Sequence, residues 1–133
     1  MEVEQYMAGP ALVSVEDVLS AVGINAHGNC SKAVLHQVPE SETSLFSVNP
    51  GQKLAPHIHT KTWDLFLVVS GKGEIRYRGD GEEGVVQMPS RAFCAMPPGY
   101  EHEVCNLSNA EPFSFLLIHA PWTGYDFVKT AKS

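Results

Sequence analysis

The feature that most constrains the fold is a succession of short β-rich runs between residues 32 and 120, each cut off by Gly, Pro, Asn or Asp. The breaks include "NPG", "SGKG", "RGDGEEG" and "PPGY", and the pair Asp80-Gly81 suits a tight hairpin turn. No helical pattern that could serve as a crossover lies between the runs. Many short strands without crossover helices indicate an antiparallel barrel or sandwich, and therefore an all-β fold.

One short helix is predicted ahead of the strands, in "SVEDVLSAVG". Ser14 suits the N-cap with Asp17 three residues on, the apolar residues that follow share a face, and Gly23 ends the pattern. A chain of 133 residues suits one domain. We expect an N-terminal helix and lead-in segment at 1–32, a β-barrel at 33–122 and a C-terminal tail at 123–133.

The run "DLFLVVS" is apolar on both faces. Residues two apart on a strand share a face, so Phe66 and Val68 lie with Asp64, and Leu65 and Leu67 lie opposite. The outer face then has to be covered by a second sheet, the helix or another subunit. This pattern is a hint of a homodimer.

Charge and composition exclude several classes of partner. There are 9 Lys and Arg residues against 15 Asp and Glu, and the basic ones are scattered, which argues against nucleic-acid binding. The start "MEVEQYMAGP" lacks the basic region of a signal peptide, and no apolar run reaches the length of a membrane span. The 3 cysteines lack a C-x-x-C spacing. We expect a reduced, cytoplasmic protein that binds neither nucleic acid nor membrane.

The stretch "HIHTKTWD" concentrates the metal-binding residue types. His57 and His59 project from one face of a strand and can offer nitrogens to one ion, although such pairs also occur on solvated faces. Asp64 follows after an interval long enough for a turn, and His102 opens another strand after the rigid turn "PPGYE". Three imidazoles and a carboxylate would suit one divalent transition metal, namely iron, zinc, nickel, copper or manganese.

Two segments resemble the signature motifs of the cupin family. "GQKLAPHIHTKTWDLFLVVSG" is similar to the first motif, G-x5-H-x-H-x3,4-E-x6-G, with aspartate at the glutamate position. "RAFCAMPPGYEHEVCN" is similar to the second, G-x5-P-x-G-x2-H-x3-N, with Arg91 in place of the opening glycine. Residues 72–90 separate the two motifs. The matching positions are Gly51, His57, His59, Gly71, Pro97, Gly99, His102 and Asn106.

The resemblance implies a double-stranded β-helix (jelly-roll) barrel with a metal near one mouth, open coordination positions for a small molecule, and frequent dimers. Asp64 is then either a ligand or an acceptor for a ligating histidine or a bound water. Tyr100 and Glu101 precede His102 at the expected mouth and are candidates for acid, base or substrate contact, although turn residues more often face solvent. For His119, which lies in a strand-like run, a satisfied core or surface role is favoured over substrate contact.

The leading functional hypothesis is a metal-dependent enzyme that acts on a small organic molecule. A facial set of histidines with vacant positions suits an oxidoreductase of the dioxygenase type. The same site without redox chemistry suits an isomerase, cyclase or lyase. The alternative is a non-catalytic cupin that binds or senses a small molecule, and the sequence leaves substrate and reaction class open.

Overall fold

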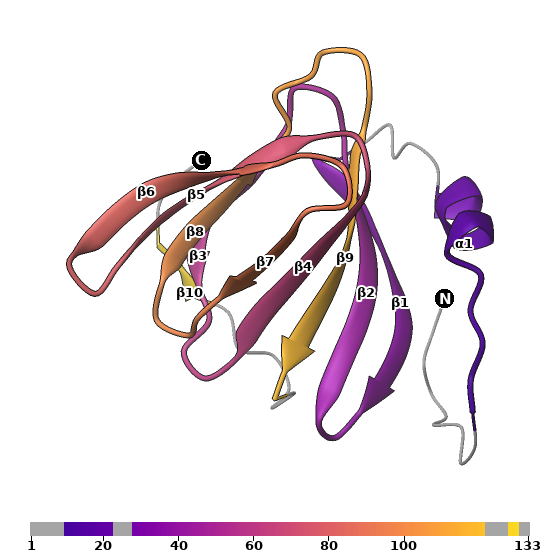
Figure 1. Ribbon diagram of the computed structural model, residues 1–133, viewed down its shortest axis with the longest axis horizontal. Coiled ribbons are helices and arrows are strands. Elements are labelled where there is room, and N and C mark those ends of the chain that lie inside the picture. Colours follow the sequence, from indigo (N-terminus) through magenta and orange to yellow (C-terminus); the bar gives the residue numbers. More distant parts are fainter. Residues whose placement is uncertain (1–9, 23–27, 122–127, 131–133) are drawn as a thin grey trace.

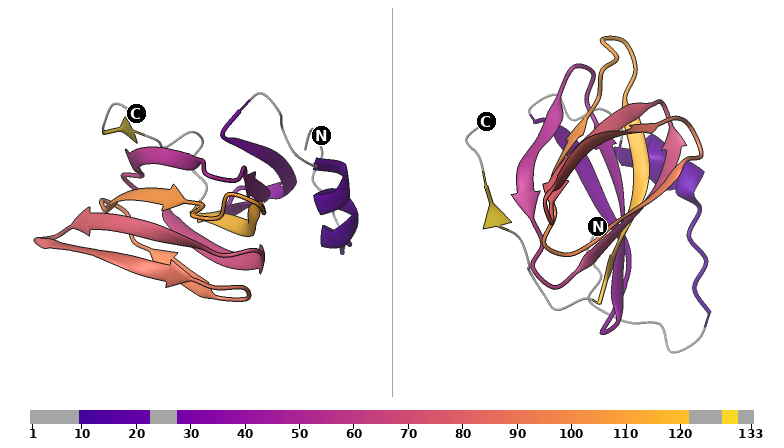
Figure 2. Two further views of the ribbon diagram at one scale, coloured as in Figure 1. Left: turned by 90° about the horizontal axis from the view of Figure 1, so that it is seen from above. Right: turned by 60° about the vertical axis from the view of Figure 1, so that its left-hand side comes forward.

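The computed structural model describes residues 10–22, 28–121 and 128–130, and this part of the chain forms two antiparallel sheets preceded by one helix (Figures 1 and 2). In chain order the elements are α1 (Val15–Val22), β1 (Cys30–Val38), β2 (Ser41–Val48), β3 (Lys53–Ile58), β4 (Trp63–Ser70), β5 (Gly73–Gly79), β6 (Glu82–Met88), β7 (Phe93–Met96), β8 (Glu101–Cys105), β9 (Phe113–Ala120) and β10 (Val128–Lys129).

The strands alternate between the two sheets along the chain. Sheet A has the order β1-β2-β9-β4-β7, and sheet B has the order β10-β3-β8-β5-β6. Apart from the hairpins β1–β2 and β5–β6, each strand is followed by one in the other sheet. The chain therefore winds as a double-stranded β-helix, which confirms the predicted fold. This winding brings side chains from β3, β4, β8 and β9 to the inside of one barrel.

The predicted helix is confirmed as α1. The Ser14 hydroxyl accepts a hydrogen bond from the Asp17 backbone N–H at 3.2 Å, as an N-cap does. Gly23 lies outside the described residues. Strand β1 begins at Cys30, within the segment predicted as lead-in, and β10, in the predicted tail, pairs with β3. Among the described residues no helix has the length and apolar character needed to cross a bilayer.

Positive backbone φ angles mark the turns that the sequence predicts. Asp80 and Gly81 have φ of 49° and 76° and join the paired residues Gly79 and Glu82, so the two-residue hairpin is confirmed. Arg91, which replaces a motif glycine, keeps a left-handed φ of 70°. The substitution therefore leaves the turn that opens the second motif in its left-handed form.

The hydrophobic core lies between the sheets and beside the predicted metal site. Phe66, Phe113 and Phe115 are at most 1% exposed, and the Phe115 ring stacks on Phe46 with centroids 5.5 Å apart. Val104 is likewise buried, as the alternation from His102 predicts. This packing fixes the strands that carry the site.

The outer face of β4 is partly exposed in the described part of the chain. Leu67 is 42% exposed, and its register partner on β7, Phe93, is 62% exposed. Helix α1 lies against β1 and β2. The homodimer, in which a second subunit would cover these exposed residues, stays a prediction.

We predict that Phe115→Ala lowers the free energy of unfolding by about 3–5 kcal/mol, because it leaves a cavity against three neighbouring rings. Urea unfolding followed by circular dichroism measures this. The matched control, Phe93→Ala, removes an exposed ring and should change the free energy of unfolding by no more than about 0.5 kcal/mol. Equal losses in the two variants would contradict this description of the core.

Candidate metal centre

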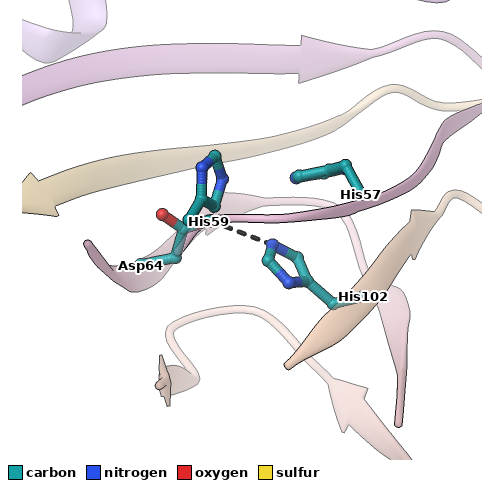
Figure 3. A group of neighbouring side chains, drawn as sticks. All are labelled: His57, His59, Asp64 and His102. Carbon is teal, nitrogen blue, oxygen red and sulfur yellow. Dashed lines mark hydrogen bonds and ion pairs between the residues drawn. The ribbon is translucent and has the colours of Figure 1, made fainter. Parts of the chain in front are cut away.

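Four buried side chains converge inside the barrel, and they are the four that the sequence predicts as ligands. His57 lies on β3, His59 just after it, Asp64 on β4 and His102 on β8. One potential ligand atom of each lies within 4.8 Å of those of the other three (Figure 3). The cluster therefore draws on both sheets.

Strand register and one backbone hydrogen bond bring the two motifs together. His57 and His102 are directly paired across β3 and β8, so their side chains share the inner face of sheet B. The N–H of Gly99 donates to the His59 carbonyl at 2.8 Å. The turn of the second motif is thereby fixed against the end of the first.

Backbone carbonyls set the tautomers of two of the histidines. Nδ1 of His57 lies 2.8 Å from the Ala55 carbonyl, and Nδ1 of His102 lies 3.0 Å from the Tyr100 carbonyl. A carbonyl only accepts, so each Nδ1 carries the proton. In the neutral ring Nε2 is then the nitrogen with a free lone pair, which is the arrangement found in metal-binding histidines.

Asp64 is the charged centre of the cluster. Its Oδ2 lies 3.1 Å from Nε2 of His59 and 3.0 Å from Nε2 of His102. Burial alone would raise the pKa of Asp64, but hydrogen bonds from His102, His119 and His59 outweigh it and hold the pKa below its usual range. The carboxylate is therefore ionised at neutral pH.

These contacts fit a bound cation. Nε2 of His102 lies 3.0 Å from an ionised carboxylate oxygen, while Nδ1 of the same ring donates to the Tyr100 carbonyl. Two acceptors at this distance repel each other unless a proton or a metal ion lies between them. Two atoms this close could both serve as ligands of one cation. Asp64 thus lies among the candidate ligands despite its shorter side chain.

His57 has the protonation state that a ligand needs. Burial and, to a lesser degree, the neighbouring His102 lower its pKa to about 4, although the hydrogen bond to the Ala55 carbonyl acts in the opposite direction. The ring is therefore neutral at pH 7, with no proton to compete for the lone pair.

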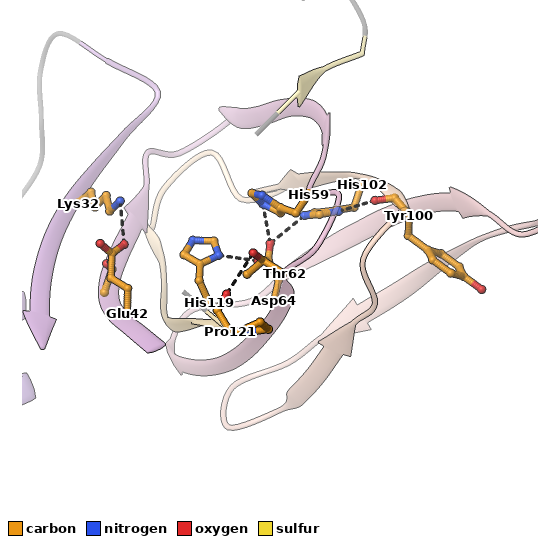
Figure 4. Close-up of polar contacts among 10 residues, drawn as sticks. Lys32, Glu42, His59, Thr62, Asp64, Tyr100, His102, His119 and Pro121 are labelled. Atoms are coloured by element: carbon orange, nitrogen blue, oxygen red, sulfur yellow. Dashed lines mark hydrogen bonds and ion pairs between the residues drawn. The ribbon is translucent and has the colours of Figure 1, made fainter. Parts of the chain in front are cut away.

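His119 contacts the cluster, although the sequence did not single it out as a site residue. It is buried at the end of β9, and its Nδ1 lies 2.7 Å from Oδ1 of Asp64 (Figure 4). The alternation Phe113, Phe115, Leu117 places it on the inner face, but no motif spacing marks it. His119 therefore contacts Asp64 from outside the four-residue cluster.

The two predicted catalytic residues lie differently with respect to the cluster. Tyr100 meets it through its backbone carbonyl, while its ring points away from the cluster and packs beside Tyr77, with centroids 6.1 Å apart (Figure 4). Glu101 pairs with Arg78 at 2.9 Å, and both lie on the outward-facing side of their strands. Catalytic roles for Tyr100 and Glu101 stay predictions.

Comparisons with known proteins agree with the fold. The family described as polysaccharide biosynthesis C-terminal domain matches residues 26–126. A search of functionally curated proteins finds no match. An uncharacterized conserved protein with a double-stranded β-helix domain from Klebsiella pneumoniae is 25% identical over 93% of this chain and 100% of its own, with a TM-score of 0.70.

Two further solved structures share the fold. CapF, a capsular polysaccharide assembling protein from Staphylococcus aureus, is 23% identical over 80% of this chain and has a TM-score of 0.66. The match spans 31% of the CapF chain, and CapF has also been solved with the inhibitor 3-isopropenyl-tropolone. A cupin-2 domain from Rhodospirillum rubrum is 15% identical over 78% of this chain and 67% of its own, with a TM-score of 0.66. The cupin resemblance is confirmed at the level of the fold.

We predict that His57→Ala and His102→Ala each weaken binding of a divalent ion at least about 100-fold while the protein stays folded, because each removes a candidate ligand. Competition with a chromogenic chelator measures the affinity, and circular dichroism checks the fold. The control is His36→Ala on β1, a histidine outside the cluster. If both cluster variants kept wild-type affinity, the site would lie elsewhere.

A pH dependence follows from the lowered pKa of His57. Between its ordinary value of 6.5 and about 4, the unfolded chain binds a proton at His57 that the folded chain does not. The free energy of unfolding of the metal-free protein should therefore fall as the pH drops through this window. Urea unfolding in a chelator measures it, and His57→Gln should show a shallower fall. Parallel pH profiles would contradict the assignment.

Proposed function

Because the chain belongs to the family of polysaccharide biosynthesis C-terminal domains, we propose that it is a metal-dependent enzyme that acts on a small carbohydrate-derived molecule. The observation that carries the proposal is the buried convergence of His57, His59, Asp64 and His102. Carbohydrate derivatives offer adjacent hydroxyl and carbonyl oxygens, which suit the open positions of such a site. We propose that these two oxygens bind there together.

The charge of the ligand set favours Lewis-acid chemistry on a carbonyl compound. A divalent ion held here would polarise a carbonyl oxygen and stabilise negative charge that develops on it. The histidines are neutral as ligands, so Asp64 supplies the single negative charge of the set. The site then keeps net positive charge, which favours an oxyanionic form of the substrate. Isomerase, cyclase or lyase activity fits this balance.

Apolar residues beside the cluster support catalysis in a partly dry site. The Phe66 ring lies edge-on to His102, with centroids 6.3 Å apart and the ring planes 88° from each other. Phe66 is 1% exposed, and Leu117, its direct register partner on β9, is 4% exposed. Low local polarity strengthens the attraction between a charged site and a developing oxyanion.

The identity of the ion separates this proposal from the oxygenase hypothesis. A dioxygenase needs a redox-active metal, whereas zinc in the same site permits only the Lewis-acid reactions. Metal analysis of protein purified without added metal is therefore the first experiment. We expect one divalent ion per chain, and absence of metal together with no affinity for added divalent ions would refute the proposal.

We predict that the metal-loaded protein exchanges deuterium from heavy water into keto-sugars or sugar acids at the carbon next to the carbonyl, without consuming dioxygen. Mass spectrometry measures the exchange, and an oxygen electrode run in parallel detects oxygenation of diketones and phenols. His57→Ala, which should not hold the ion, is the control.

Each outcome has a distinct meaning. Exchange that is lost in His57→Ala supports the proposal, while consumption of dioxygen would replace it with the dioxygenase reading. Binding without turnover across the panel would favour the non-catalytic alternative.

Because CapF has been solved with 3-isopropenyl-tropolone, this compound, whose two adjacent oxygens can chelate an ion, serves as a binding probe. We expect it to bind the metal-loaded wild type more tightly than the metal-free protein.

A further inference from the structure

His119 faces the candidate metal centre from a strand that neither motif includes. It is buried, and its ring centroid lies 5.1 Å from that of His59. We propose that His119 is a positioning residue, which holds Asp64 so that Oδ2, and not Oδ1, faces the other ligands. This inference rests on the proposed metal-dependent function and names a determinant of metal affinity outside the four-residue cluster.

The two oxygens of Asp64 have different partners. Oδ1 lies 2.7 Å from Nδ1 of His119, while Oδ2 lies 3.0 Å from Nε2 of His102 and 3.1 Å from Nε2 of His59. An ionised carboxylate only accepts, so any proton shared in this contact comes from His119, although the geometry is that of a close ion pair and not of an aligned hydrogen bond. The last torsion of an aspartate is broad, so without this donor the carboxylate plane would turn more freely. The contact therefore assigns one oxygen to His119 and the other to the ion.

The strands hold this contact in place. Asp64 and His119 are directly paired across β4 and β9. Just beyond the pair, the Thr62 hydroxyl donates to the Pro121 carbonyl at 3.2 Å, which ties the start of β4 to the end of β9 (Figure 4). The separation of the two side chains is thus set by backbone pairing and not by a flexible loop.

The neighbouring strand continues the polar row. Glu42 on β2 pairs with His119, and it is buried with its Oε2 2.7 Å from Nε2 of Gln37 on β1. The row across the inner face of sheet A is therefore Gln37, Glu42, His119 and Asp64. The adjacent row contains Ser44, Leu117 and Phe66, of which only Ser44 is polar. Polar side chains cross the sheet at the level of the metal centre, and His119 is the member that contacts a candidate ligand.

Asp64 stands at the position where the cupin motif has glutamate. Asp64 is one methylene shorter, so its carboxylate stays close to the wall formed by sheet A. His119 belongs to that same wall and reaches the rear oxygen directly. We infer that the contact with His119 holds the shorter side chain of Asp64 in place at the site.

The test compares two substitutions of similar size. The His119→Asn variant keeps a nitrogen donor two bonds from Cβ, which is the position of Nδ1 in histidine. The His119→Leu variant has no donor. We expect His119→Leu to bind Zn²⁺ about 10–100-fold more weakly than wild type, the usual effect of losing an outer hydrogen bond to a ligand, and His119→Asn to recover most of the loss. Chelator competition gives the affinities. The visible spectrum of the Co²⁺ form should change in the Leu variant and stay close to wild type in the Asn variant.

A double-mutant cycle with Asp64→Ala identifies the route of the effect. If His119 acts through Asp64, His119→Leu should have little further effect in the Asp64→Ala background. A full effect in that background would show that His119 binds the ion itself and would overturn the inference, as would equal Zn²⁺ affinity of wild type and His119→Leu. If Asp64→Ala does not fold, the comparison of Leu with Asn decides alone. Wild-type protein that binds neither ion would refute the proposed function, and this inference with it.

Discussion

The buried carboxylate of Asp64 is the charge around which the interior of this barrel is arranged. An ionised group inside a protein costs several kcal/mol unless partners offset the loss of water. Here the partners come from both sheets, with His119 beside Asp64 in sheet A and His59 and His102 from the side of sheet B. A bound cation would offset the same negative charge. One carboxylate therefore affects both the stability of the fold and the binding of metal.

The winding of the chain makes this convergence possible. Because successive strands alternate between sheets, the first motif supplies residues to both walls, and the second supplies its histidine opposite His57. Asn106, the last residue of the second motif, has a purely structural place: its Nδ2 donates to the carbonyls of Val48 and Glu111 at 3.1 and 2.8 Å, and its Oδ1 accepts from the N–H of Ser108 at 3.0 Å. The motif residues thus divide into those that hold the loops and those that face the site.

The sequence predicted those parts of the structure that local spacing determines. The N-cap at Ser14 and the hairpin at Asp80 follow from short-range patterns, and the four clustered residues follow from the two motifs that resemble the cupin signature. The contact made by His119 could not be predicted because it depends on the pairing of β9 with β4. His119 lies opposite Asp64, which is 55 residues earlier in the chain, and no local pattern indicates that pairing. Tyr100 is the opposite case. Its place next to His102 is evident from the sequence, but the turn directs its backbone carbonyl, and not its ring, toward the cluster.

We propose that three imidazoles and one carboxylate surround a single divalent ion in this barrel. X-ray absorption spectroscopy of the metal-loaded protein tests it most directly, because imidazole rings give a characteristic outer-shell scattering pattern. We expect about three imidazole nitrogens and oxygen ligands, with metal–ligand distances near 2.1 Å and no sulfur. A spectrum with sulfur ligands, or one without imidazole scattering, would contradict it.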